Sequence, residues 1–252
     1  MSSPFRNVTG RVSLHPRFEA KRSAVSAPRT EAAIQKMREM IASGRLLPGE
    51  RLPPEAELAA NVGASRNTVR EAVRALVTAR VLDVRRGDGT YVTSLRPELL
   101  LDGMTAAVEL MHEGFSLELI AVRRILEPAA TRIAAQRMDN ATIDELEVLR
   151  TKLEEAPTEA ERIPFDAAFH ALIARKSENA TLASMLAAVS SKTVRARAWR
   201  GMADREASAR TITQHREILD ALRARDPDRA EAAAMVHVAT TEAWFREAQG
   251  ND

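Results

Sequence analysis

Hydrophobic residues recur every three or four positions along most of this 252-residue chain, a spacing that predicts a mostly helical protein. Ile34, Met37, Met40 and Ile41 form the apolar stripe of a first helix, which the stretch SGRLLPGERLP ends. The stretch PEAELAANVG predicts a short second helix, with proline at its start and Gly63 just past its end.

The stretch ASRNTVREAVRALVTARV predicts a third helix, with Ser65 as its N-cap. Val69, Val73 and Leu76 would pack this helix onto the first two. The β-prone runs around Gly-Asp-Gly in LDVRRGDGTYVT predict a hairpin. Three helices followed by a glycine hairpin are the elements of a winged helix-turn-helix, which we expect over residues 29–94.

From about residue 98 onward the hydrophobic period stays near 3.6, with no strand candidate and no internal repeat. We therefore expect an all-α bundle of six or seven helices over residues 95–248. The predicted helices are 98–112, 116–138, 142–155, 160–177, 180–200, 205–225 and 227–248.

Composition narrows the function classes. A net charge of only +2 means that any nucleic-acid contact must come from a local basic patch. The absence of cysteine excludes disulfides and thiolate metal sites, and no apolar run reaches the roughly 18 residues of a membrane span. We expect a cytoplasmic protein with no membrane partner. Residues 1–28 lack periodicity and carry five cations against one acid, which predicts a disordered basic arm.

The third helix carries a candidate DNA-reading surface. Arg66, Asn67 and Arg70 lie on its first turns, opposite the apolar side, and the positive end of a helix attracts phosphate. Arginine pairs bidentately with guanine, and asparagine with adenine. Arg86 lies beside the hairpin tip, where it would approach the flanking DNA. A solvated basic helix face is the alternative for the arginines alone, but the complete order of elements favours DNA reading.

The stretch LLPGERLPPEAELAANVGASRNTVREAVRALVTARVLDVRRGDGTYV closely resembles the DNA-binding domain of GntR-family transcription regulators. That family's pattern runs G-x-x-L-P-S-E-x-x-L-A, then G-V-S-R-x-T-V-R-E-A-L-x-x-L, then G-x-G-T-x-V. The resemblance implies that Arg66 and Arg70 contact operator bases or phosphates. It also implies DNA contacts for Ser65, Asn67, Arg86 and Gly87.

Two positions depart from that family pattern. Ala56 stands where many members carry a DNA-contacting arginine, so one usual contact is missing. Arg80 replaces the glycine that usually ends the recognition helix, where a left-handed backbone would strain an arginine. Either the helix ends differently here, or Arg80 supplies a compensating backbone contact.

A second candidate site lies in the helical part. Asp166 and His170 are four residues apart in FDAAFHALI and therefore share one helix face. His215 and His237 lie on the apolar stripes of two later helices. Each histidine alone is more typical of a hydrogen-bonded core residue. One carboxylate and three imidazoles converging in a bundle suit a divalent ion, Zn²⁺ first, with Ni²⁺ or Mn²⁺ as alternatives.

The stretches LIAVRRILEPAATRIAA, FDAAFHALIARKSENATL and QHREILDALRARDPDRAEAAAMVHV resemble the all-helical ligand-binding domain, of FCD type, of the FadR subfamily of GntR regulators. The resemblance implies that Asp166, His170, His215 and His237 are metal ligands. It further implies that Arg123 contacts the carboxylate of an effector. Asn179 matches a position near the effector pocket.

These features predict a DNA-binding transcription regulator, a repressor by default, that binds operator DNA as a homodimer. A small carboxylate effector (a sugar acid, hydroxy acid or dicarboxylate) would bind at the metal and change the affinity for DNA. We expect no enzymatic activity, because no general base or nucleophile motif accompanies the metal ligands. Two alternatives stay open: a metal-dependent hydrolase with an appended DNA-binding domain, and a regulator whose metal is purely structural.

Overall fold

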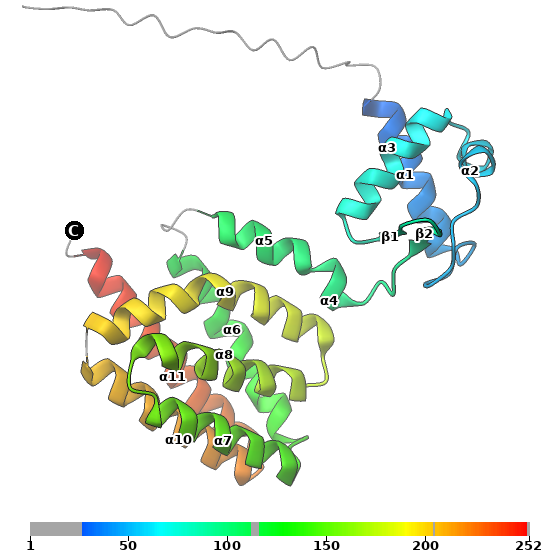
Figure 1. The fold of residues 1–252 in the computed structure, drawn as a ribbon. Coiled ribbons are helices and arrows are strands. Elements are labelled where there is room, and N and C mark those ends of the chain that lie inside the picture. Colours follow the sequence, from blue (N-terminus) through cyan, green and yellow to red (C-terminus); the bar gives the residue numbers. More distant parts are fainter. Residues whose placement is uncertain (1–26, 112–115, 204, 251–252) are drawn as a thin grey trace, which may run out of the picture.

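The computed structural model describes residues 27–111, 116–203 and 205–250, so the predicted basic arm lies almost wholly outside the described residues. The prediction of a mostly helical protein, with a winged helix-turn-helix ahead of an all-α bundle, is confirmed (Figure 1). The elements of the first part are α1 (Ala27–Ala42), α2 (Glu55–Val62), α3 (Arg66–Thr78), β1 (Leu82–Arg85) and β2 (Gly89–Val92).

Local sequence signals explain where the elements of the DNA-binding part begin and end. Gly63 follows α2 with a left-handed φ of 66°, and the Ser65 hydroxyl accepts a hydrogen bond from the Thr68 backbone N–H at the start of α3. The two strands pair antiparallel, with Leu82 opposite Val92. One shared core holds the three helices and the hairpin together. Its fully buried residues include Met37, Leu58, Val69, Leu76 and Leu82.

Arg80 does adopt the left-handed conformation that the family pattern reserves for glycine, with φ of 58°. Its N–H bonds the Val77 carbonyl at 3.0 Å, and the Val81 N–H bonds the Leu76 carbonyl at 2.9 Å, which is the Schellman pattern of a helix end. The helix therefore ends in the usual way despite the arginine. The guanidinium makes an exposed ion pair with Asp102 at 3.3 Å.

Replacing Arg80 by glycine is expected to stabilise the protein. The left-handed conformation costs a residue with a Cβ about 1–2 kcal/mol, and glycine does not have this cost. Part of the gain is lost because glycine also increases the conformational entropy of the unfolded chain. The net gain is about 0.5–1 kcal/mol, or roughly 2 °C in the melting temperature. Arg80→Ala is the matched control, because alanine keeps the strain. A glycine variant that melts no higher than the alanine variant would contradict the strain at this position.

The described remainder of the chain is all helical. Residues 98–111 were predicted as part of one helix, but they form two, α4 and α5, because the chain turns at Leu101, whose ψ of −3° interrupts the helix. The longer helices follow the predicted order. The elements are α4 (Pro97–Leu100), α5 (Asp102–Leu110), α6 (Ser116–Ala135), α7 (Asn140–Glu155), α8 (Glu159–Lys176), α9 (Ala180–Ala203), α10 (Arg205–Arg223) and α11 (Pro227–Gly250).

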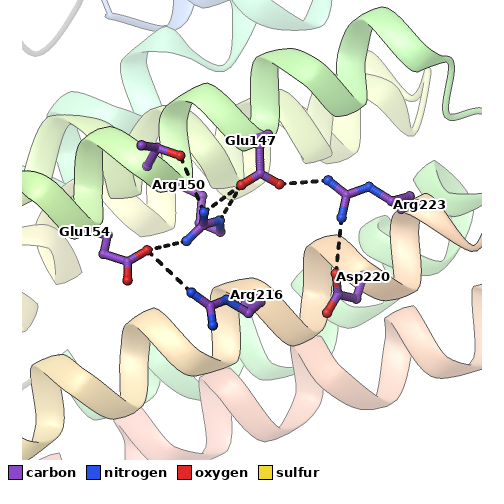
Figure 2. A network of polar contacts seen from close by, with 7 residues as sticks. Glu147, Arg150, Glu154, Arg216, Asp220 and Arg223 are labelled. Carbon is purple, nitrogen blue, oxygen red and sulfur yellow. Dashed lines mark hydrogen bonds and ion pairs between the residues drawn. The ribbon is translucent and has the colours of Figure 1, made fainter.

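A buried cluster and a surface ion-pair network hold α10 in the bundle. Leu146, Phe169 and Leu222 belong to the core that joins α7, α8, α10 and α11. Figure 2 shows how charged side chains connect α7 to α10. Glu147 bonds Arg223 at 2.7 Å, and the other contacts run through Arg150, Glu154, Arg216 and Asp220. This pairing fixes the helix that carries His215.

Candidate metal centre and nucleic-acid interface

The structure brings together all four residues that the sequence singled out as metal ligands. Asp166 and His170 come from α8, His215 from α10 and His237 from α11. One ligand atom from each lies within 4.8 Å of the others. His215 and His237 are buried, and Asp166 and His170 are half-buried. The helices α8, α10 and α11 therefore present one carboxylate and three imidazoles to a single point inside the bundle.

The spacing of the ligand atoms fits a first-row divalent ion. Nε2 of His170 lies 3.0 Å from Nε2 of His215. Oδ1 of Asp166 lies 3.3 Å from Nε2 of His215 and 3.6 Å from Nε2 of His170. Two ligands that each stand about 2.1 Å from one ion at right angles are about 3.0 Å apart, and a wider angle gives a longer separation. The cluster thus has the dimensions of a coordination site.

The outer nitrogens of two histidines lie close to side-chain oxygen atoms that orient the rings. His170 Nδ1 lies 2.6 Å from Oε1 of Glu127, and His237 Nδ1 lies 3.2 Å from Oε1 of Gln214. Both partners are acceptors, so each Nδ1 carries a hydrogen and each Nε2 keeps its lone pair. Nε2 of His237 is buried and makes no hydrogen bond within the described part of the chain. A metal ion is the partner that such an orphaned lone pair fits.

Charge around the site shifts the pKa values of two of the histidines in opposite directions. Burial lowers the pKa of His237, and the neighbouring His215 and His170 lower it further, to well below its ordinary value. His237 is therefore a neutral imidazole, the form that binds a metal. Burial lowers the pKa of His170 too, but the charge of Glu127 and hydrogen bonds with Asp166 and Glu127 outweigh it, so the net shift is upward.

Arg123 is fully buried behind the site, at 1% exposure. Its Nε and Nη2 both donate to Oε2 of Glu127, at 3.0 Å and 2.7 Å. Burial raises the pKa of Glu127, but the charge of Arg123 and the contact with His170 hold it well below its usual value. A continuous chain of contacts thus runs from Arg123 through the Glu127 carboxylate to His170 and the ligand cluster.

Sequence reasoning missed Glu127 and Gln214, the two side chains that orient the histidines. Glu127 stands four residues after Arg123, a spacing that places an acid and a base on one helix face and could have indicated the pair. Gln214 immediately precedes His215 in the chain, but its partner is on another helix. Nothing in the local pattern indicates that contact.

A cavity of about 660 Å³ extends from the ligand cluster along α8 and α9 to α4 and α5. Glu127 and His170 form its inner end, and Arg123 is not among its lining residues. Alanines and hydroxyl groups make up much of its wall, and the hydroxyls come from Thr105, Ser184, Ser190 and Ser191. Asn179 is exposed at the start of α9, where its Oδ1 accepts a hydrogen bond from the Leu182 N–H. Its neighbour Glu178 lines the cavity.

The residues expected to read DNA lie exposed on α3. Arg66 and Asn67 occupy its first turn, directly after the capping residue Ser65. Arg70, one turn further, makes a two-point contact with the Glu55 carboxylate on α2, at 3.0 Å and 3.3 Å. The carboxylate therefore holds the guanidinium on the outer surface of the helix pair.

The hairpin tip presents Arg86 and Gly87 to solvent, and Gly87 has the left-handed φ of 75° that the turn requires. The guanidinium of Arg85 lies over the Tyr91 ring in a cation–π contact, with its central carbon 3.9 Å from the ring centre. Ala56 is exposed on α2, beside Glu55. The local surface thus combines the cations of α3 and the hairpin with several acidic residues, among them Glu55 on α2 and Asp88 at the hairpin tip. Among the described residues, no helix is both long and apolar enough to cross a membrane.

Comparison with protein families finds two matches that together cover most of the chain. The family described as "Bacterial regulatory proteins, gntR family" matches residues 29–92, and the family described as "FCD domain" matches residues 118–240. Both matches fall on the parts of the chain that carry the two candidate sites.

Similar proteins that match over most of their length are transcription regulators by name. The chain is 28% identical to the galactonate operon transcriptional repressor of Escherichia coli (strain K12), over 87% of this chain and 97% of that protein. It is 30% identical to RmpR of Mycobacterium gastri, named as an HTH-type transcriptional regulator, over 86% of this chain and 80% of the relative. A solved structure, Streptococcus agalactiae GntR, is 26% identical with a TM-score of 0.59, over 85% of this chain and 99% of that one.

Proposed function

Since the chain belongs to the gntR family of bacterial regulatory proteins and carries an FCD domain, it is a DNA-binding transcription regulator, and we propose that it is a repressor controlled by a small carboxylate held at a metal ion. The family is non-enzymatic, so the metal-dependent hydrolase considered from the sequence does not apply. The observation that carries the proposal is the four-ligand cluster, one member of which, His170, lines a cavity.

The proposed metal ligands are Asp166, His170, His215 and His237. Three neutral imidazoles and one carboxylate leave a divalent ion with a net positive charge, and a bound ion of this kind attracts a carboxylate or hydroxyl oxygen. Zn²⁺ is the first candidate, and Ni²⁺ or Mn²⁺ also suit nitrogen and oxygen ligands. The cavity lies on the His170 side of the cluster, so an effector would approach the ion from there.

The chemistry of the cavity favours a hydroxy acid with a single carboxylate. Glu98, Asp102 and Glu178 line its outer part against one cation, Arg175, so a second carboxylate at that end would meet mostly negative charge. The serine and threonine hydroxyls suit a ligand rich in hydroxyl groups. Two relatives point to the same class, because their names refer to operons for galactonate and for L-lactate dehydrogenase.

Arg123 is proposed as the effector-sensing arginine, acting through Glu127. Its two bonds to Oε2 fix the carboxylate whose other oxygen orients His170. A direct contact with the effector would require the guanidinium to exchange Glu127 for the effector carboxylate. Asn179, which caps α9 next to the cavity wall, is proposed to shape the cavity mouth rather than to bind the effector itself.

Repression is proposed to depend on a homodimer whose two α3 helices read two half-sites of a near-palindromic operator. Ser65, Arg66, Asn67, Arg70, Arg86 and Gly87 are the proposed DNA contacts. Effector binding would favour a dimer geometry in which the spacing of the two reading helices no longer matches the half-sites. A tenfold loss of operator affinity needs only about 1.4 kcal/mol of coupling between the sites.

Replacing Arg70 by alanine is expected to weaken operator binding, by about 1–3 kcal/mol if the guanidinium reads a base. A phosphate contact would instead lower the salt slope of binding by about one unit. Fluorescence anisotropy with operator DNA at several salt concentrations distinguishes the two. Arg229→Ala, an exposed arginine of α11, is the control. Unchanged binding by the Arg70 variant would remove this residue from the interface.

Thermal unfolding against a panel of acids tests the proposed effector site. The metal-loaded protein is melted with sugar acids, hydroxy acids and dicarboxylates, and the series is repeated after chelation. We expect one hydroxy acid to raise the melting temperature and this shift to vanish on chelation. A large drop on chelation with no response to any acid would instead make the metal structural, with regulation through other ligands or proteins.

A further inference from the structure

The ion pair between Glu55 and Arg70 occupies only one edge of the guanidinium group. Nε and Nη2 of Arg70 donate to the two carboxylate oxygens of Glu55, at 3.3 Å and 3.0 Å. Nη1 and the second N–H of Nη2 make no hydrogen bond within the described part of the chain. Because the five N–H groups of arginine form a rigid planar fork, Nη1 and Nη2 present two parallel donors on an edge that the carboxylate does not cover.

The charge of the pair disfavours a phosphate contact. The hydrogen bond from Arg70 lowers the pKa of Glu55, so the carboxylate stays ionised at neutral pH and the pair has no net charge. A phosphate bound to Arg70 would therefore lie close to a second negative charge, and the two would repel each other. A guanine carries no net charge and presents two acceptors, O6 and N7, which two N–H groups of one arginine can bind. The pair thus suits a base better than the DNA backbone.

The contact also fixes the position of the guanidinium before DNA is bound. Glu55 is the first residue of α2 and Arg70 lies in α3, and the two helices share a buried core that includes Leu58 and Val69. The two paired side chains are each about half exposed, at 51% and 50%. Without the pairing, a long arginine side chain at such an exposed position samples several rotamers. Restricting it in advance lowers the entropy cost of a contact with one particular base.

We propose that Glu55 determines operator specificity by holding Arg70 so that its Nη1–Nη2 edge reads one guanine in each half-site. The inference rests on the DNA-binding surface of the proposed function, and it specifies that Arg70 contacts a base and not a phosphate. Glu55 acts through Arg70 and is therefore a positioning residue. Its own contribution is the direction in which the guanidinium points.

Selection of binding sites from a pool of randomised DNA duplexes tests this assignment. The wild-type protein should enrich sites with guanine at one fixed position of each half-site, and Arg70→Ala should lose that preference. A bidentate arginine discriminates against a wrong base roughly 5- to 150-fold, and we expect Glu55→Gln to lower this preference about tenfold. Glu57→Gln is the matched control, because Glu57 is also an exposed acid in the first turn of α2. It should keep the wild-type preference.

The sign of the change in affinity provides a second readout. Glu55→Gln removes a negative charge from the DNA-binding surface, so electrostatics alone would strengthen binding to every duplex. We expect affinity for the selected site to fall about tenfold, whereas affinity for a duplex of unrelated sequence stays the same or rises. Fluorescence anisotropy with both duplexes at several salt concentrations measures the two affinities.

Three results would contradict the proposal, and they identify which step is wrong. If Arg70→Ala loses the guanine preference but Glu55→Gln keeps it, Arg70 reads a base without help from Glu55. If Arg70→Ala keeps the preference and weakens binding to all duplexes equally, Arg70 contacts a phosphate. In both cases the DNA-binding function stands. If the wild-type protein enriches no sequence at all, the proposed DNA-reading surface is wrong as well.

Discussion

Replacing His215 by alanine is expected to abolish stoichiometric metal binding. His215 is fully buried, and its Nε2 lies within 3.3 Å of ligand atoms from both Asp166 and His170, so it occupies the middle of the cluster. Loss of a group that merely orients a ligand costs 10–100-fold in metal affinity, and loss of a ligand itself should cost about 100-fold or more. Metal content after dialysis, measured by plasma mass spectrometry, should fall to the background level.

The neighbouring variant Arg216→Ala is the matched control, because Arg216 follows His215 on α10 but is more than half exposed. It should bind metal like the wild-type protein. Since the His215 ring packs against Phe169 with centroids 4.7 Å apart, the alanine variant also leaves a gap in the core. His237→Ala separates the two effects, and metal content at the wild-type level in both histidine variants would show that the ion binds elsewhere.

Replacing Arg123 by alanine is expected to lower the free energy of unfolding by about 3–5 kcal/mol, because the buried Glu127 carboxylate loses its cation. The melting temperature should fall by roughly 10 °C. Arg124→Ala provides the comparison: this adjacent arginine is half exposed, and its buried partner Glu242 keeps a second ion pair with Arg246, so the loss should be about 1 kcal/mol or less. Urea unfolding of both variants measures the difference.

A double-mutant cycle with Glu127 tests whether the loss of stability comes from the ion pair between Arg123 and Glu127. If the carboxylate without its partner is the cause, Arg123→Met combined with Glu127→Gln should be more stable than Arg123→Met alone. Glu127→Gln should also weaken metal binding 10–100-fold, since Glu127 orients His170. An Arg123→Ala protein of full stability that lost only its response to the effector would instead make Arg123 a direct effector ligand.

The local chemistry of the chain could be predicted well from its sequence. Three features depend on residues only a few positions apart: the capping serine, the glycine that ends α2, and the hairpin around Gly-Asp-Gly. Short stretches of sequence are therefore enough to predict them. For Arg80 the sequence left two helix ends open, and only the hydrogen bonds that end α3 show that the chain keeps the left-handed one. The break at Leu101 could not be predicted, since the pattern of residues 98–111 continues across it.

Helical periodicity specifies which face of a helix is apolar, and this is enough to place Asp166 and His170 together and to turn His215 and His237 inward. It does not specify which inward faces meet. Several contacts of the candidate sites join separate helices. Helices α8, α10 and α11 meet at the ligand cluster, Glu127 supports His170, and Gln214 supports His237. In the same way, Glu55 on α2 binds Arg70 on α3. Such contacts follow from the packing of the whole core, which the period of any single helix does not contain.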